Sequence, residues 1–209
     1  MTSERKIYFY PVWLRIWHGI NALGILVLIA TGLSMQYSNP EYPLINFELA
    51  VNLHNISGIL VSANYLLFVI GNLMTSKNKF YRLKMRGLHK RIQSQAVYYM
   101  YGMFKYQQHP FPLSEKRKFN PLQKVSYLIT MYLFVPAIIL TGWALLFPET
   151  IIEDVYNISG IFLTAILHTI LGILISFFLI IHLYVASIGK SPLSNFKSII
   201  HGYHHIHNH

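Results

Sequence analysis

Residues 160–188 read GIFLTAILHTILGILISFFLIIHLYVASI, an apolar run that contains no charged residue. About 20 consecutive apolar residues are enough for a helix to cross the hydrocarbon core of a membrane, so this run predicts a transmembrane helix. His168 and His182 lie inside it, 14 residues apart. In a helix that spacing separates them by about 21 Å along the axis. Both also lie near one face, because 14 steps of about 100° end about 40° short of whole turns.

Three more apolar blocks predict three more transmembrane helices. The four predicted helices cover about residues 12–37, 49–73, 123–147 and 160–188. Hydrophobic residues make up 54% of the chain and charged residues only 11%, against about 25% charged in a soluble domain. We therefore expect one all-α domain over residues 1–209. It is an integral membrane four-helix bundle with a long basic cytoplasmic loop between helices two and three (75–122) and a cytoplasmic tail (189–209).

The first apolar block is expected to stay in the protein as helix one. It contains a charged residue, Arg15, and lacks the small-residue cleavage site of a signal peptide.

The distribution of charge predicts the orientation of the bundle. A net charge of +10 spread over a soluble surface would suggest a nucleic-acid partner. Here all 17 Lys and Arg fall in the N-terminal segment up to Arg15, in or beside the central loop, or after helix four. The other two connections hold five acids and no base: Glu41, Glu48, Glu149, Glu153 and Asp154. By the positive-inside rule we expect a multi-pass protein of the bacterial cytoplasmic (inner) membrane, with both termini cytoplasmic, lipid as a partner and no nucleic acid.

The histidines inside the apolar blocks form two pairs of equal depth. His18 and His182 fall in the cytoplasmic half, and His54 and His168 fall in the outer half. Ionisable side chains inside a membrane are costly and usually mark a functional site, and neutral imidazole is a common axial ligand of haem iron. We predict two haem b groups whose iron these histidines ligate, an inner one on His18 and His182 and an outer one on His54 and His168. The alternative for each histidine is a packed side chain bonded to a carbonyl.

The lack of cysteine narrows the kind of cofactor. The chain has none, which excludes iron–sulfur ligation, a disulfide framework and a covalently attached c-type haem. Any haem is therefore held by axial bonds and packing alone.

The residue four positions after each of these histidines is small. These residues are Ala22, Gly58, Gly172 and Ala186. Positions i and i+4 share a helix face, so a small side chain there leaves room for a porphyrin plane. Small residues also line helix–helix contacts in membranes, but that alternative does not explain why they follow all four histidines.

Three further features of the sequence each allow two interpretations. Arg15 lies on nearly the same face as His18 and would pair with a haem propionate, or it reaches the membrane interface by snorkelling. Residues 96–104 are aromatic but too short to span, which favours a helix in the inner interface or a segment packed under the bundle. The C-terminal histidines could hold Zn²⁺ or Ni²⁺ loosely, but their spacing does not match a structural zinc site, and we expect a flexible tail. These histidines are His201, His204, His205, His207 and His209.

Several stretches carry a family resemblance: RIWH (15–18), TGL (31–33), HNISG (54–58), NPLQK (120–124), TGW (141–143) and the two histidines of helix four. With them the chain resembles the four-helix di-haem cytochrome b superfamily. Its members include formate dehydrogenase gamma subunits, the b-type cytochromes of Ni,Fe-hydrogenases and thiosulfate reductase cytochrome b subunits. The resemblance implies a site for menaquinone or ubiquinone near the inner haem, at Asn120 and Gln123. Leu122 stands where the formate dehydrogenase branch has glycine, and Asn120 before Pro121 would also cap a helix.

The two predicted haems would carry electrons across the membrane, and the resemblance implies that these electrons pass between a quinone pool and a partner oxidoreductase subunit of a respiratory chain. That partner would be a molybdopterin, hydrogenase, iron–sulfur or multihaem protein. Bis-histidine ligation leaves no open iron position, and the outer connections contain no acid–base or nucleophile constellation, so we expect catalysis in the partner.

Two alternatives remain open. One is a stand-alone superoxide oxidase coupled to quinone, which the acidic outer connections disfavour. The other is a haem-free anchor or transporter. Transporter histidines usually accompany acidic residues inside the membrane. None of the four apolar blocks contains Asp or Glu.

Overall fold

The computed structural model of the chain describes residues 4–8, 10–39, 41–74, 85–112, 119–188 and 191–207. The helices are α1 (Val12–Tyr37), α2 (Phe47–Met74), α3 (Leu88–Val97), α4 (Pro121–Ile129), α5 (Val135–Leu146), α6 (Gly160–Ser187) and α7 (Ser194–His201). The shorter π and 3-10 segments are η2 (Tyr98–Gly102), η3 (Met103–Lys105), η4 (Thr130–Phe134) and η5 (Pro148–Thr150). The strands are β1 (Glu4–Tyr8), β2 (Asp154–Val155), β3 (Ile158–Ser159) and β4 (Tyr203–His207).

The structure confirms the four predicted spans and the mostly helical membrane fold. α1, α2, the continuous α4–η4–α5 and α6 are each long and apolar enough to cross a membrane. Their bounds differ from the predicted ones by at most two residues. α2 begins two residues early because the Asn46 side chain accepts the Leu49 backbone N–H at 3.3 Å and so caps the helix.

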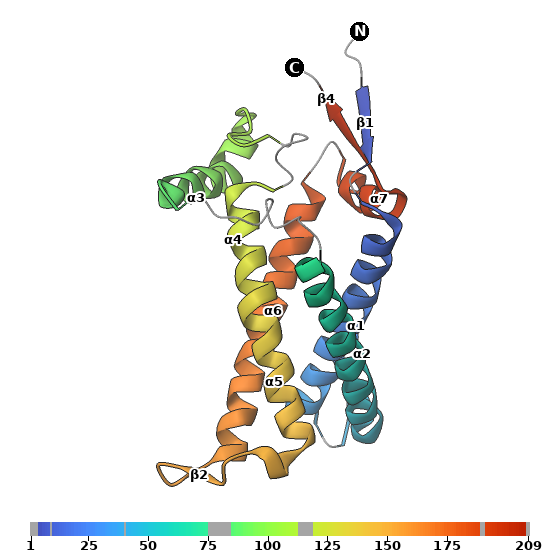
Figure 1. Ribbon diagram of the computed structural model, residues 1–209, viewed down its shortest axis with the longest axis vertical. Coiled ribbons are helices and arrows are strands. Elements are labelled where there is room, and N and C mark those ends of the chain that lie inside the picture. The colour runs from blue at the N-terminus through green and yellow to red at the C-terminus, as the bar shows by residue number, and fades with distance from the viewer. Residues whose placement is uncertain are drawn as a thin grey trace.

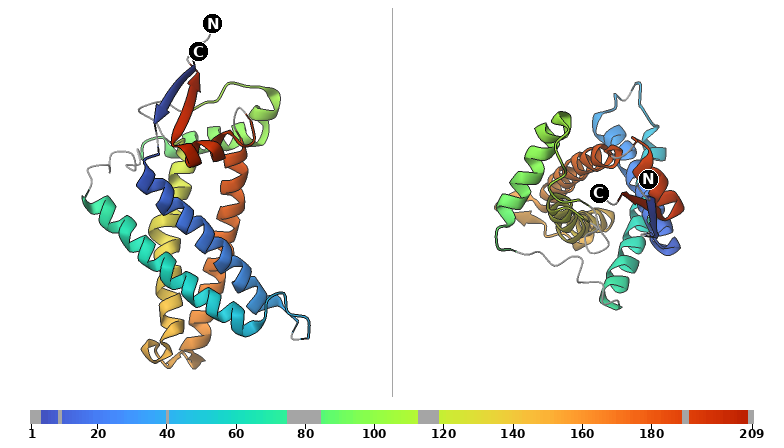
Figure 2. Two further views of the ribbon diagram at one scale, coloured as in Figure 1. Left: turned by 90° about the vertical axis from the view of Figure 1, so that its right-hand side faces the viewer. Right: turned by 90° about the horizontal axis from the view of Figure 1, so that it is seen from above.

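The bundle consists of two helical hairpins that cross. α1 packs along α2, and α5 packs along α6, whereas the two hairpins touch each other at fewer places. Figure 2 shows α1 and α2 running obliquely across α5 and α6. Within the described residues the buried apolar side chains are few: Ala50, Val61, Val135, Leu171 and Ile175. The chain's own apolar core is therefore small.

A π segment in the second hairpin accommodates Pro136. Proline has no N–H, and in π spacing the carbonyl of Met131 would pair with position 136. The Tyr65 hydroxyl on α2 donates to that carbonyl at 2.9 Å. The helix thus forms a π segment before Pro136, and the Met131 carbonyl, which has no N–H partner at position 136, ties the two hairpins together through Tyr65.

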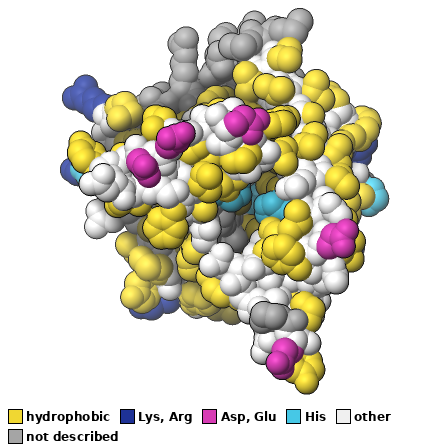
Figure 3. Space-filling view, turned by 90° about the horizontal axis from the view of Figure 1, so that it is seen from below, with side chains coloured by type: hydrophobic (Ala, Val, Ile, Leu, Met, Phe, Trp, Pro, Cys, Tyr) yellow, Lys and Arg dark blue, Asp and Glu magenta, His cyan; other side chains and the backbone are white. Residues whose placement is uncertain are grey.

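The two ends of the bundle differ in charge and in the elements they carry. One end of the bundle, at the top of Figure 1, holds both termini, α3 and α7. The Lys and Arg described in these elements lie there, and we name it the basic end. The end with the α1–α2 and α5–α6 connections carries the five acids predicted there, and we name it the acidic end. Figure 3 views the acidic end, with acidic side chains spread over it and basic ones only at its rim.

The helical segment of the central connection is longer than predicted. It runs through α3, η2 and η3 (88–105) rather than over residues 96–104. Its first turns contain good helix formers such as Lys90, Arg91 and Gln95, which a search for apolar residues overlooks. The segment packs against the start of α4, while Met100 and Phe104 stay more than half exposed. Residues 75–84 and 113–118 of the predicted loop lie outside the described residues.

The described part of the C-terminal tail, residues 191–207, contains a helix and a strand, where the sequence predicted a segment without regular structure. After α7, β4 pairs antiparallel with β1, with Tyr203 opposite Tyr8. Both termini lie at the basic end, so their extended backbones satisfy one another's hydrogen bonds. Gly202 joins α7 to β4 with a φ of 88°. A β-carbon there would lie 2.7 Å from the Tyr8 ring and 2.8 Å from the Tyr10 carbonyl.

Candidate functional site

The basic-end pair, His18 and His182, joins the two hairpins. His18 lies on α1 and His182 on α6, and their ring centres are 6.3 Å apart with planes inclined by 46°. Phe178, one turn before His182, stacks on its ring at 5.8 Å and 19°. Trp17, next to His18, donates its indole N–H to the Asn64 carbonyl at 3.0 Å, and the Asn64 amide donates back to the Trp17 carbonyl at 3.0 Å. The stack orients the His182 ring on α6, and the two Trp17–Asn64 bonds join α1 to α2 beside His18.

The acidic-end pair, His54 and His168, also has one histidine from each hairpin. His54 lies on α2 and His168 on α6, with ring centres 6.2 Å apart and planes inclined by 67°. In Figure 3, histidine side chains show in a hollow between the helices at this end. The structure therefore brings together the same two pairs that helix depth predicts, with α6 contributing to both.

A threonine holds each ring of the acidic-end pair. Thr31 Oγ1 lies 2.9 Å from His54 Nδ1, and Thr141 Oγ1 lies 2.9 Å from His168 Nδ1. Each hydroxyl also donates to the carbonyl four residues earlier in its own helix, at 2.7 and 3.0 Å. A hydroxyl has one proton to give, so it accepts from the imidazole Nδ1–H. That bond leaves Nε2 unprotonated, which is the tautomer that binds a metal.

A glycine follows each of these threonines and makes room for the ring. A β-carbon at Gly32 would lie 3.5 Å from His54 Cε1, and one at Gly142 would lie 3.1 Å from His168 Cε1. The Thr–Gly pairs of α1 and α5 thus serve α2 and α6 in the same way. Both stretches carry the family resemblance, which by itself gives no role to Thr31 or Thr141. Their repetition before both outer histidines was the signal that would have found them.

The separations within both pairs fit a bis-histidine haem. A metal–imidazole bond of about 2 Å on each side of one ion, plus about 1 Å from each nitrogen to its ring centre, puts two ring centres about 6 Å apart. The observed values are 6.3 and 6.2 Å. A porphyrin would supply the other four ligands of the iron. His18, His54 and His168 are half-buried and His182 is exposed, so none of them is a fully packed core side chain.

The small residues four positions after the histidines are half-buried. A β-carbon at Gly58 or at Gly172 would find its nearest neighbour only at 3.9 Å. Both sites therefore have room beside the histidine-bearing face. Whether Ala22, Gly58, Gly172 and Ala186 pack against a porphyrin remains a prediction.

Arg15 makes one hydrogen bond at the basic end and has a further donor without a partner. Its Nη1 donates to the Ile200 carbonyl near the end of α7. Its Nε is buried and has no hydrogen-bond partner among the described residues. A guanidinium has five N–H donors, so the propionate contact remains a prediction that this orphaned donor supports.

Asn120 and Gln123 form a capping box at the start of α4. Asn120 Oδ1 accepts the Gln123 backbone N–H at 2.8 Å, and Gln123 Oε1 accepts the Asn120 backbone N–H at 3.2 Å. The Asn120 amide also donates to the Tyr99 hydroxyl at 2.8 Å, and the residue is 3% exposed. The structure thus shows the capping alternative. Direct contact with a quinone remains a prediction, and the burial of Asn120 weighs against that residue.

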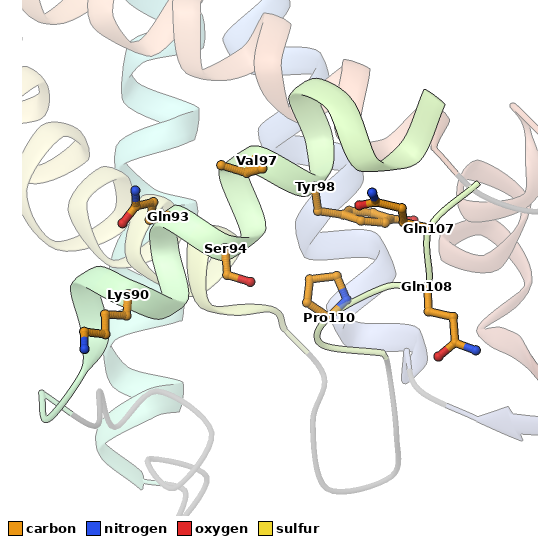
Figure 4. Close-up of a pocket in the computed structure, with 8 residues that line it drawn as sticks. All are labelled: Lys90, Gln93, Ser94, Val97, Tyr98, Gln107, Gln108 and Pro110. Atoms are coloured by element: carbon orange, nitrogen blue, oxygen red, sulfur yellow. The ribbon is translucent and has the colours of Figure 1, made fainter. Parts of the chain in front are cut away.

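A buried polar cluster joins α3 to this capping box. Gln95 is fully buried, and its amide lies 3.5 Å from His109 Nε2. Burial lowers the pKa of His109 and raises the pKa of Tyr99. Beside the cluster, a cavity of about 410 Å³ opens between α3 and residues 107–110 (Figure 4). It is separate from both histidine pairs.

The histidines of the tail are not placed as a metal site. His204, His205 and His207 belong to β4, whose side chains from residue 204 on lie outside the described part of the chain, as does His209. The described residues contain no cluster of three or more His, Cys, Asp or Glu suited to a metal ion.

The fold and the site define a class of protein: a multi-pass membrane protein with paired histidines suited to haem. The comparisons with known proteins support a membrane cytochrome. The model of the prokaryotic cytochrome b561 family matches residues 9–202, and the chain belongs to that family. It is a membrane cytochrome of electron transport. The chain is also similar to the Escherichia coli (strain K12) protein named "Putative cytochrome YdhU", at 35% identity over 199 residues, which are 95% of this chain and 75% of the relative. No solved structure matches the chain significantly.

Proposed function

We propose that this cytochrome is a di-haem subunit that carries electrons across the membrane between a quinone pool and a partner oxidoreductase of a respiratory chain. The observation that carries the proposal is the pair of histidine pairs, each spanning the two hairpins at a separation that suits one iron. Bound haem b would supply one-electron chemistry at two levels of the bundle.

The chain's own residues would hold and orient the cofactors. His18 and His182 would ligate one iron and His54 and His168 the other. Thr31 fixes the ring of His54 as Thr141 fixes that of His168. Arg15 would donate from its unpaired Nε–H to a propionate near the basic end.

The charge asymmetry supports an orientation. By the positive-inside rule the basic end faces the cytoplasm of a bacterial inner membrane. Menaquinone or ubiquinone would then meet the chain near the start of α4, and the partner subunit, a molybdopterin, hydrogenase, iron–sulfur or multihaem protein, would exchange electrons at the other face. The acidic end is a poor entry for superoxide anion, so we do not propose the oxidase activity.

Two exposed tyrosines provide a matched test of the orientation. Tyr106 at the basic end is 97% exposed, and Tyr156 at the acidic end is 95% exposed. The natural chain has no cysteine, so Tyr106→Cys and Tyr156→Cys each create a single label site. In intact spheroplasts a membrane-impermeant maleimide is expected to label only Tyr156→Cys. Labelling of only Tyr106→Cys would contradict the orientation.

The redox role is tested with purified protein in lipid vesicles. A short-chain menaquinol or ubiquinol analogue is expected to reduce the haems, with the absorbance change of a b-type α-band as the signal. Dithionite-reducible haem that neither quinol reduces would contradict the quinone role, while leaving the haem ligation intact.

A further inference from the structure

The two histidine pairs differ in their hydrogen bonding. In the acidic-end pair, Nδ1 of each ring lies 2.9 Å from a threonine hydroxyl, and we assign the proton of this bond to the ring because each hydroxyl donates to a carbonyl of its own helix. Neither ring of the basic-end pair has a hydrogen-bonded neighbour within the described residues, and the contact of His182 is an aromatic stack on Phe178. The ligand type is therefore the same at both ends, while its surroundings are not.

A hydrogen bond from Nδ1–H makes an imidazole a stronger electron donor through Nε2. A stronger donor stabilises ferric iron over ferrous iron, and second-shell hydrogen bonding is one of the means by which a protein sets a haem potential. Thr31 and Thr141 would therefore lower the potential at the acidic end.

Charge acts in the same direction. Arg15, three residues before His18, is a cation at the basic end with a buried Nε. The five acids of the connections lie at the opposite end. Positive charge favours the reduced form of a haem and negative charge disfavours it, so charge adds to the effect of the threonines.

We propose that Thr31 and Thr141 make the acidic-end haem the lower-potential haem of the two, so that an electron in the chain rests at the basic end. This inference depends on the proposed di-haem function. It assigns a positioning and tuning role to two residues outside the ligand set, and it gives electron flow a favoured direction, from the acidic to the basic end.

The test is a potentiometric titration of the purified protein, followed by the optical α-band and by low-temperature EPR. The wild type is expected to show two midpoint potentials. In Thr31→Val and in Thr141→Val only the lower one is expected to rise, which shifts the electron distribution about fivefold toward the acidic end in each variant. Thr31→Ser keeps the hydroxyl and is expected to behave as the wild type.

Thr164→Val is the matched control. Thr164 lies on α6, as His168 does, and its hydroxyl donates to the Gly160 carbonyl at 2.8 Å. The control therefore loses the same kind of backbone bond without touching a histidine, and both potentials are expected to stay in place. A shift in the control as large as that in Thr31→Val would contradict the specific role.

A second measurement covers the case in which a valine variant binds no haem. His18→Ala is expected to retain only the acidic-end haem, and His54→Ala only the basic-end haem. The basic-end haem is expected to titrate at the higher potential. The reverse order, or two haems whose lower potential is unchanged in Thr31→Val, would contradict the inference alone. Fewer than two haems in the wild type would contradict the proposed function itself, and the inference with it.

Discussion

The two histidine pairs have nearly equal ring separations but different surroundings. At the acidic end, Thr–Gly pairs on α1 and α5 supply a hydrogen bond to each ring and space beside it. At the basic end, Phe178 stacks on His182, and reciprocal hydrogen bonds between Trp17 and Asn64 join α1 to α2 beside His18. The crossing of the hairpins thus sets the separation of the rings, and local residues set their electronic surroundings.

The largest effect is expected when one ligand is removed from either pair. His18→Ala and His54→Ala should each lower the haem content by one per chain, because an iron with a single protein ligand is held weakly. Pyridine haemochrome analysis of detergent-purified protein measures this. His109→Ala, which removes a histidine outside both pairs, is the control and should keep both haems.

A second prediction compares the two glycines of the acidic end. Gly142→Ala places a methyl group 3.1 Å from His168 Cε1, so the ring must move, whereas Gly32→Ala meets His54 at 3.5 Å, an ordinary contact. Overpacking of this kind costs about 1–3 kcal/mol. Gly142→Ala should lose the acidic-end haem faster on transfer to apomyoglobin, and Gly32→Ala should stay close to the wild type. Equal loss in both variants would mean that the space beside the rings does not matter.

A third prediction tests whether haem binding at the basic-end pair depends on the connection that precedes α4. Asn120→Ala removes the cap of α4 and should lower the free energy of unfolding by about 1 kcal/mol, because the Gln123 N–H loses its acceptor. Thermal unfolding in detergent measures the change, and the haem content should stay at the wild-type value. Asn120→Asp keeps an accepting oxygen and should be milder. Loss of the basic-end haem in Asn120→Ala would show that the pair depends on this connection.

The smallest effect concerns pH at the basic end. Burial lowers the pKa of His109 from 6.5, so the unfolded chain takes up that proton before the folded one does. The stability of α3 should therefore be unaffected by His109 well above about pH 6.5 and should fall as the pH drops through it. Hydrogen exchange of the α3 amides measures this. A slope that persists in His109→Gln would assign the effect to another group.

Much of the fold followed from hydropathy and charge because the membrane imposes simple rules on length and sign. The four spans and the depth of the histidines needed only these rules. The pairing of β1 with β4 was missed, since it depends on where the bundle brings these two segments. The helical turns before residue 96 were missed because Lys90 and Arg91 are polar.

The candidate site was predicted only in part for a similar reason. Histidine is rare inside a membrane and is visible in the sequence, whereas a threonine in an apolar helix is not conspicuous. The roles of Thr31 and Thr141 depend on contacts between helices, which no spacing within one helix reveals. The sequence offered a cap at Asn120, because Asn followed by Pro121 is typical of a helix start, and the structure has that cap.

The most direct test of the central claim is the haem content of two double variants. If the pairs are those of the structure, His18→Ala with His182→Ala removes both ligands of one iron and should leave one haem b per chain. His18→Ala with His54→Ala damages both pairs and should leave none. Equal haem content in the two double variants, or a wild type with no haem, would contradict the account.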